Sequence, residues 1–238
     1  MNRAVFEDPV SLMNNILQVT AFLKEKIKAQ GGDPQRETLD FLCAEDGKPY
    51  FIDSYGEYWR AYHFIEDAYA LEEISSPQDF YESAVAFGHF QKMLADFPAD
   101  TLTETIAGFH DTRSRFTAFQ KAVEQDVCQR AADVAGEIRF VRERYDVACI
   151  LGDMQAEGKL PLRVTHNDTK SNNVLIDSAT GKGLCVIDLD TVMPGLAVND
   201  FGDSIRFGAS TGAEDEKDLS RISCDMDFYD IYTKGFLE

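Results

Sequence analysis

The side chains best suited to chemistry are concentrated in one segment, LRVTHNDTKSNNVLIDSATGKGLCVIDLD, which covers residues 162–190. An apolar strand pattern leads into a polar loop, and two further strand patterns follow, separated by the turn sequence SATGKG. The last of these strands is predicted to end in Asp188. The polar loop carries His166, Asp168, Lys170 and Asn173. We expect the hairpin to bring Asp188 close to this loop.

This spacing fits the transfer of a phosphoryl group from ATP to a hydroxyl. The reaction needs a positioned acceptor hydroxyl, a divalent metal ion and positive charge near the moving phosphoryl group. Asp168 and Asn173 have the separation that joins a loop base to a metal ligand, and Asp188 ends the strand that should carry a second metal ligand. Lys170 is predicted to reach the phosphoryl oxygens as a point charge. His166 is predicted to orient the loop rather than to take a proton.

Each of these residues also has a structural interpretation. Asp168 and Asn173 could make Asx turns, Lys170 could be a solvated loop cation, and His166 could be a buried structural histidine. Their order, the flanking strands and the terminal carboxylate together favour chemistry over four separate structural roles.

The sequence CVIDLDTV has a second interpretation as a haloacid dehalogenase-like signature. Asp188 would then form an aspartyl-phosphate, and Asp190 would act as the general acid and base. That motif belongs on the first strand of a Rossmann-like domain. Only 50 residues follow Asp188, and they show no alternation of strands and helices, so the sequence disfavours this alternative.

The surrounding elements form a helix, a small antiparallel sheet, a connector and a largely helical region, which together indicate an α+β fold. Asp8-Pro9 begins the first helix and Gly31-Gly32 ends it. Strand patterns cover residues 38–45, 49–54 and 57–65 and predict a meander, followed by an acidic connector at 66–73. The predicted helices that follow cover residues 77–97, 110–125 and 131–155, and a last helix approaches Glu238.

Composition limits the functional classes. The chain has 238 residues, 44% of them hydrophobic, and a formal net charge of −19 without a Lys/Arg cluster, which argues against nucleic-acid binding. Its five cysteines are scattered and form no C-x-x-C pair, which indicates reduced thiols in the cytoplasm. No run approaches the roughly 20 apolar residues of a membrane span, and the first residues lack the apolar core of a signal peptide.

The sequences THNDTKSNNVLI, VIDLDTVMPG and NDFGDSIR resemble the aminoglycoside phosphotransferase/choline kinase-like superfamily. Within it they are most similar to the N-acetylhexosamine 1-kinase type of sugar kinase, as is the opening NRAVFEDPVSLMNNI. The resemblance implies a protein-kinase-like, two-lobed fold and Mg²⁺-ATP-dependent phosphorylation of a small molecule. In the sugar kinases the acceptor is the anomeric hydroxyl of N-acetylglucosamine or N-acetylgalactosamine.

The resemblance also implies roles for individual residues. Asp168 is similar to the catalytic base, and Asn173 and Asp188 are similar to the metal ligands. The connector is similar to the hinge whose backbone contacts adenine. The residues of this connector are Phe64, Ile65 and Glu66. We expect a partial N-lobe over residues 1–66 and a C-lobe over residues 67–238.

The sequence NDFGDSIR contains the letters that mark the metal-binding turn of protein kinases. Asp200 lies 32 residues after Asp168 and follows PGLAV, a predicted loop, whereas Asp188 lies 20 residues after Asp168 at a strand end. In the resembled family the later aspartate is a structural anchor. We therefore predict that Asp200 ties the catalytic loop to the lobe, and that Asp203 and Arg206 form a buried ion-pair brace beside it.

The sequence also departs from the family pattern. No glycine-rich loop or strand lysine precedes the first helix, Arg3 is a poor substitute for that lysine, and Glu25 lies near the far end of the helix. We expect the chain to be a fragment or truncated product of a longer kinase, with weak or no activity alone. A kinase of an amino alcohol or aminoglycoside and a non-catalytic nucleotide-binding remnant remain alternatives. His110 and Asp111, with Arg113 nearby, are weaker candidates for the acceptor site.

Overall fold

A computed structural model describes residues 1–72, 74, 76–212 and 215–238, so residue 73 of the predicted acidic connector lies outside the described residues. Helix α1 covers Pro9–Ala29, as predicted. Asp8 caps it by accepting hydrogen bonds from the backbone amides of Val10 and Ser11. Gly31 follows its end with φ of 79°, a conformation that favours glycine. One face of α1, from Leu12 to Ile27, is buried.

The predicted meander after α1 is antiparallel but has much shorter strands than expected. Strand β1, Phe51–Ile52, pairs with β2, Tyr58–Trp59, and the first strand pattern is reduced to a bridge between Phe41 and Tyr62. The connector prediction was wrong in one respect, because Ala68–Ala70 form strand β3. This strand pairs with a later hairpin, so tertiary pairing has overridden the acidic pattern.

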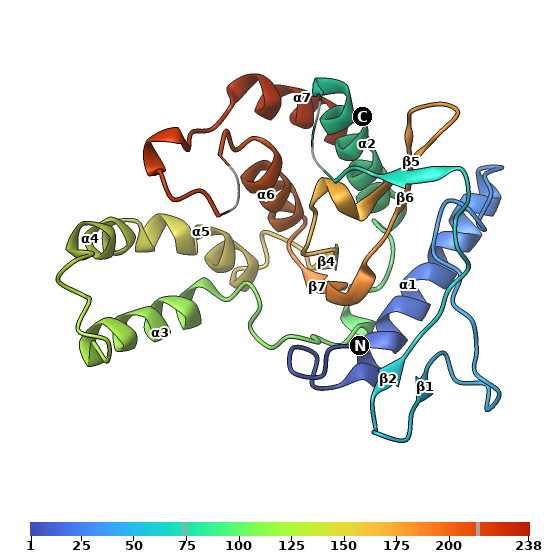
Figure 1. The fold of residues 1–238 in the computed structure, drawn as a ribbon, viewed down its shortest axis with the longest axis horizontal. Helices are drawn as coiled ribbons and strands as arrows, with labels where there is room; N and C mark the ends of the chain where they lie inside the picture. Colours follow the sequence, from blue (N-terminus) through green and yellow to red (C-terminus); the bar gives the residue numbers. More distant parts are fainter. Residues whose placement is uncertain (73, 75, 213–214) are drawn as a thin grey trace. The chain divides into compact units, whose positions relative to one another are not determined.

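The predicted hairpin after the polar loop is present. Strand β5, Val174–Asp177, pairs with β6, Gly183–Val186, in a three-stranded sheet of order β3-β5-β6. Figure 1 shows β5 and β6 next to helix α2. Strand β4, Arg163–Thr165, pairs with β7, Met193–Gly195. Gly195 approaches Thr165 so closely that a Cβ atom there would lie 2.3 Å from Thr165 Oγ1. Short 3₁₀ helices cover Ala99–Thr101, Ser171–Asn173, Leu189–Thr191 and Leu219–Arg221.

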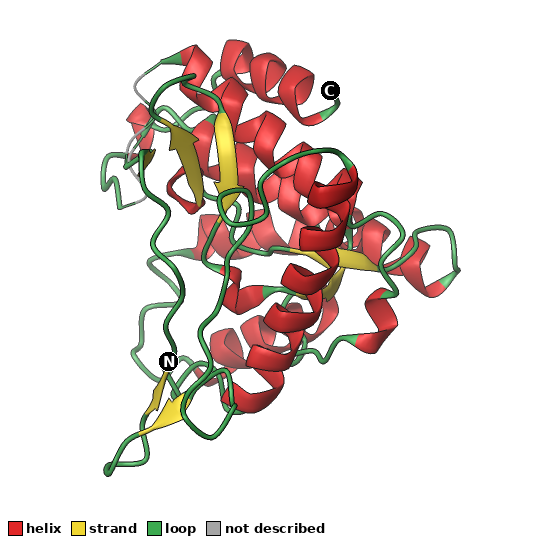
Figure 2. Ribbon diagram, turned by 90° about the vertical axis from the view of Figure 1, so that its right-hand side faces the viewer, coloured by secondary structure: helices red, strands yellow, loops and turns green. Residues whose placement is uncertain are grey.

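Three helices share an aromatic core. They are α2, Pro77–Met93; α6, Ala197–Gly208; and α7, Met226–Phe236. Phe80, Ala84 and Tyr232 are fully or almost fully buried in this core, and Phe201 packs against it. Figure 2 shows how much of the chain is helical and how short the strands are. Phe201, the central letter of the Asp-Phe-Gly sequence, is therefore a packing residue of α6.

The chain divides into two compact units, one of residues 1–105 and 163–238 and the other of residues 106–162. The second unit contains α3, Thr112–Gln125; α4, Ala135–Glu143; and α5, Tyr145–Ala156. The prediction of one helix over 131–155 was wrong, because the helix is interrupted at Arg144, where ψ is near 0°. The lobe boundary expected between residues 66 and 67 stays a prediction. Within the described part of the chain, no helix has the length and apolar character needed to cross a membrane.

The contact between α2 and α7 gives a test of the packing. A Cβ atom on Gly88 would lie 2.3 Å from the carbonyl oxygen of Phe236, whereas one on Gly202 in α6 would meet no described atom within 4 Å. We expect Gly88→Ala to lower the free energy of unfolding by about 1–3 kcal/mol, because backbone must move. We expect Gly202→Ala to raise it by up to about 1 kcal/mol, because alanine favours helix. Urea unfolding of both variants checks this pair, and a destabilised Gly202→Ala would contradict the helical role of the Asp-Phe-Gly glycine.

Candidate active site

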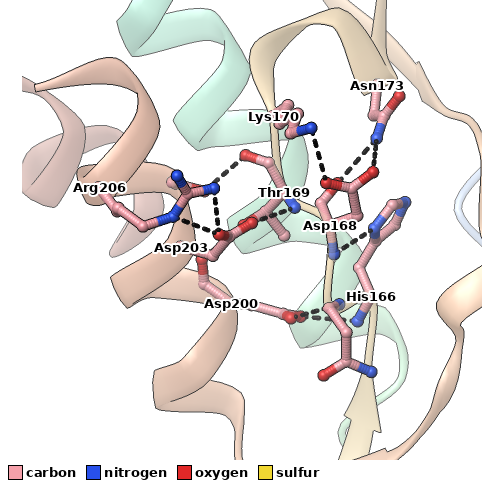
Figure 3. Close-up of polar contacts among 10 residues, drawn as sticks. His166, Asp168, Thr169, Lys170, Asn173, Asp200, Asp203 and Arg206 are labelled. Atoms are coloured by element: carbon pink, nitrogen blue, oxygen red, sulfur yellow. Dashed lines mark hydrogen bonds and ion pairs between the residues drawn. The ribbon is translucent and has the colours of Figure 1, made fainter. Parts of the chain in front are cut away.

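The polar loop after β4 brings three of the predicted residues together. Asn173 donates from Nδ2 to the backbone oxygen of Asp168 at 2.8 Å and to Asp168 Oδ2 at 3.2 Å. Lys170 Nζ lies 3.7 Å from Asp168 Oδ1. Figure 3 shows the lysine and the amide on the same side of the Asp168 carboxylate. Because that side chain remains 34% exposed, its carboxylate is held in place but stays accessible to a ligand.

His166 lies beneath the loop and is fully buried. The backbone amide of Asp168 donates to His166 Nδ1 at 3.3 Å, so Nε2 carries the proton and donates to the carbonyl oxygen of Ile187 at 2.8 Å. The rings of Phe87 and Phe90 contact the imidazole edge-on, with centroids 5.5 and 6.1 Å away. Both ring nitrogens are therefore engaged, which fits the predicted orienting role.

Asp200 of α6 anchors the polar loop. Its carboxylate accepts the backbone amides of His166 at 2.9 Å and Asn167 at 2.8 Å, and the side-chain amide of Gln91 at 2.5 Å. Burial raises the pKa of Asp200, and these three hydrogen bonds oppose the shift because they favour the ionised form. The predicted anchor is thus present, although it lies in a helix and not in a loop.

The predicted brace beside this anchor is only partly correct. Asp203 accepts the backbone amide of Thr169 at 3.0 Å and pairs with Arg206 at 3.0 Å. Arg206 is 54% exposed, so the ion pair is not buried, because the guanidinium reaches the surface of α6. A buried contact does exist next to it. The hydroxyl of Tyr232 donates to Ser204 Oγ at 2.6 Å, and Ser204 donates to the carbonyl oxygen of Thr169 at 2.9 Å.

Asp188 follows the hairpin but is not the end of a strand. Strand β6 ends at Val186, and Asp188 adopts the left-handed conformation with φ of 57° and ψ of 55°. Among the described residues, its carboxylate has no hydrogen-bond or ion-pair partner. Burial raises the pKa of Asp188, and the neighbouring carboxylates of Asp190 and Asp168 raise it further. A desolvated carboxylate without a partner is an arrangement that a cation would stabilise.

The donor set fits Mg²⁺ held jointly by protein and nucleotide. Within the described ranges, no three His, Cys, Asp or Glu side chains form a group that could hold a metal alone. Mg²⁺ usually takes one or two protein ligands and completes its shell with phosphate oxygens and water. Asn173 uses its Nδ2 toward Asp168, which leaves its amide oxygen for a cation, and Asp188 contributes an uncommitted carboxylate.

Two further residues hold the segment after Asp188, and the sequence reasoning missed both. Arg60, next to β2, forms an ion pair with Asp190. Asn15 of α1 donates to the carbonyl oxygens of Thr103 at 2.7 Å and Val192 at 3.0 Å. Asn15 could have been found as a polar residue on the otherwise apolar face of α1. Arg60 gave no comparable signal, because its partner lies 130 residues away.

The remaining candidates occupy varied environments. In the predicted hinge, Ile65 is buried, Phe64 is 82% exposed, and the carbonyl oxygen of Glu66 accepts a hydrogen bond from Arg36 at 3.1 Å. In the second unit, Asp111 caps α3 and Arg113 pairs with Asp153 at 2.5 Å. An acceptor-site role for His110 and Asp111, with Arg113 nearby, stays a prediction.

Comparison with known proteins agrees with this geometry. The phosphotransferase enzyme family, APH, matches residues 26–231. An aminoglycoside phosphotransferase from Alicyclobacillus acidocaldarius has a similar fold, with a TM-score of 0.61 and 13% identity, over 94% of this chain and 64% of that one. The fold also resembles the amicoumacin kinase hAmiN in complex with AMP-PNP, Ca²⁺ and Ami, with a TM-score of 0.53 and 13% identity, over 93% of this chain and 60% of that one.

A third similar structure is the AMP-bound spectinomycin phosphotransferase APH(9)-Ia, with a TM-score of 0.55 and 12% identity, over 92% of this chain and 66% of that one. The chain therefore spans 60–66% of the length of these structures. The shared fold is the predicted kinase-like α+β fold. It does not fit the haloacid dehalogenase alternative, because Asp188 follows an antiparallel hairpin and not a parallel strand.

The raised pKa of Asp188 predicts an unusual pH dependence of stability. Between pH 3.8 and the raised value, the folded state keeps a proton that the unfolded state has released, so stability falls as the pH rises. We expect Asp188→Asn to be more stable than wild type at pH 7 without metal, with the difference shrinking toward pH 4. Asp177 is the matched control, because Thr180 lowers its pKa and Asp177→Asn should lose stability at pH 7. The urea concentrations at the unfolding midpoint, measured at several pH values for both variants and wild type, test this prediction. An Asp188→Asn variant that is less stable than wild type at pH 7 would contradict it.

Substitutions at Asp200 and Asp188 should have different effects on metal binding. We expect Asp200→Asn to lower the free energy of unfolding by about 2–3 kcal/mol, because an asparagine amide cannot accept all three buried donors. Below its melting temperature it should still bind Mn²⁺ with AMP-PNP, whereas Asp188→Asn should not. Electron paramagnetic resonance of free Mn²⁺ measures the binding by each variant. Loss of Mn²⁺ binding in Asp200→Asn but not in Asp188→Asn would identify Asp200, the aspartate of the Asp-Phe-Gly sequence, as the metal ligand.

Proposed function

Because the chain belongs to the phosphotransferase enzyme family, we propose that it is an ATP-dependent kinase that phosphorylates a hydroxyl of a small molecule. The observation that carries the proposal is the contact of Asp168 with Asn173 and Lys170. A partly exposed carboxylate, an amide and a cation thus lie on one short loop, which supports their assignment as base, metal ligand and neutralising charge. The chain covers less than two thirds of the similar structures, so the activity refers to the whole protein.

Asp168 is proposed as the general base. Its carboxylate accepts the proton of the acceptor hydroxyl as the oxygen attacks the γ-phosphorus, and ADP leaves with the electrons of the broken bond. Asn173 Nδ2 holds the carboxylate in place, which reduces the freedom that would otherwise be lost on reaching the reactive geometry. Lys170, 3.7 Å from Asp168 Oδ1, neutralises charge on the transferred phosphoryl group.

Asn173 and Asp188 are proposed to hold Mg²⁺, which would neutralise phosphate charge when it is bound. The backbone of Phe64, Ile65 and Glu66 is proposed to receive adenine. Two observations support this hinge: Ile65 is anchored in the interior, and Arg36 fixes the Glu66 carbonyl. The similar structures include complexes with AMP-PNP, ADP and AMP, which supports ATP as the phosphoryl donor.

For the acceptor we propose the anomeric hydroxyl of an N-acetylhexosamine, which the sequence IDLDTVMPG supports. An aminoglycoside or amino alcohol is the second candidate, because similar folds belong to the spectinomycin and amicoumacin kinases. The net charge of −19 disfavours a nucleic-acid acceptor. Dependence on ATP and five free cysteines support a cytoplasmic location.

The decisive experiment is phosphoryl transfer by the whole protein from γ-labelled ATP to N-acetylglucosamine, N-acetylgalactosamine, spectinomycin and choline. We expect Asp168→Asn to lower kcat by roughly 10²–10⁴-fold while the Kd for AMP-PNP changes little, because the base acts in the chemical step. Asp46→Asn, on an exposed turn, is the matched control and should retain wild-type kcat.

Two outcomes would contradict the proposal. Tight AMP-PNP binding without transfer to any acceptor would identify a nucleotide-binding remnant. Transfer that survives Asp168→Asn would assign the base elsewhere.

A further inference from the structure

The segment from Asp188 to Met193, here called the metal loop, is held by a cation from the first part of the chain. Arg60 pairs with Asp190, and the two side chains are only 18% and 20% exposed. The guanidinium also lies 5.8 Å from the centroid of the Phe41 ring, and its Nη1 lies 4.0 Å from the sulfur of Met13 in α1. This cation–π contact and the contact with the sulfur fix the arginine without a bound ligand.

The turn that contains Asp190 is hydrogen-bonded to the polar loop that contains Asp168. Asp190 lies in the single turn Leu189–Thr191. Thr191 donates from Oγ1 to the carbonyl oxygen of His166 at 2.5 Å, and its own carbonyl accepts Asn167 Nδ2 at 2.8 Å. A displacement of Asp190 would therefore reach both the metal loop and the loop that carries the proposed base.

The charges around Asp188 explain why Asp190 has to be held. Asp190 and Asp168 repel the Asp188 carboxylate, whereas Arg60 attracts it. A free Asp190 carboxylate would compete for a cation at Asp188 and occupy a position that a phosphate oxygen or water would otherwise take. The pairing with Arg60 directs the Asp190 carboxylate toward the guanidinium instead.

We propose that Arg60 is a positioning residue of the metal loop: by holding Asp190, it keeps Asp188 alone available to the magnesium of the bound nucleotide. This inference rests on the proposed function and adds a residue that none of the kinase motifs in the sequence includes. It also assigns different roles to the two carboxylates of IDLD: Asp188 binds the cation, whereas Asp190 holds the loop in place through its ion pair with Arg60.

The test is Mn²⁺ affinity in the presence of AMP-PNP, measured by paramagnetic resonance on the full chain below its melting temperature. We expect Arg60→Met to weaken Mn²⁺ binding roughly 10-fold and Arg60→Lys to remain within about 3-fold of wild type. The control is Lys24→Met, which removes another partly buried ion pair of the same unit, with Asp40, and should leave the affinity unchanged.

A double-mutant cycle separates positioning from general stability. Asp190→Asn in the Arg60→Met background should recover part of the lost affinity, because the unheld carboxylate is gone. Equal affinity of Arg60→Met and wild type, or losses that simply multiply in the double variant, would overturn the inference while leaving the proposed function intact. Failure of wild type and Lys24→Met to bind Mn²⁺ with AMP-PNP would instead reject the proposed function, and this inference with it.

Discussion

The geometry of the candidate site depends on one buried carboxylate. Asp200 accepts the two successive backbone amides of His166 and Asn167, and no water is needed to satisfy it, because Gln91 supplies a third donor. These bonds turn the chain sharply after β4, and Asn167 takes a left-handed conformation with φ of 67°. The turn directs Asp168 outward, so a helix 32 residues away determines where the proposed base points.

The site combines polar groups that have hydrogen-bond partners with a carboxylate that has none among the described residues. Several groups of the polar loop have protein partners: His166 contacts Ile187, and Thr169 contacts Asp203 and Ser204. The buried hydroxyl of Ser171 is an exception, because it has no hydrogen-bond partner among the described residues. Asp188 lies in a left-handed backbone conformation near other carboxylates, and its carboxylate has no partner in the part of the chain that the structure describes. Such unfavourable local energy is common where a protein binds a charged ligand, because the ligand provides the missing stabilisation.

The sequence was most informative where local chemistry decides the structure. The cap at Asp8, the hairpin and the spacing of Asp168 and Asn173 all depend on neighbours within a few residues, and all were predictable. The interruption at Arg144 was not, since both flanking segments have helical patterns. The Arg60 ion pair was also hidden, because only tertiary folding brings it to Asp190. Asp200 was placed correctly through family resemblance, although its helix was not expected.

The hydrogen bonds from Tyr232 through Ser204 to Thr169 have a consequence for synthesis of the chain. A ribosome synthesises the loop that contains Asp168 before it makes α6 and α7, which carry the anchors of that loop. The nascent polypeptide therefore contains the residues of the loop before the contacts that fix their geometry can form. Order in the catalytic loop must wait until the C-terminal helices dock, which couples maturation of the site to a late, non-local folding step.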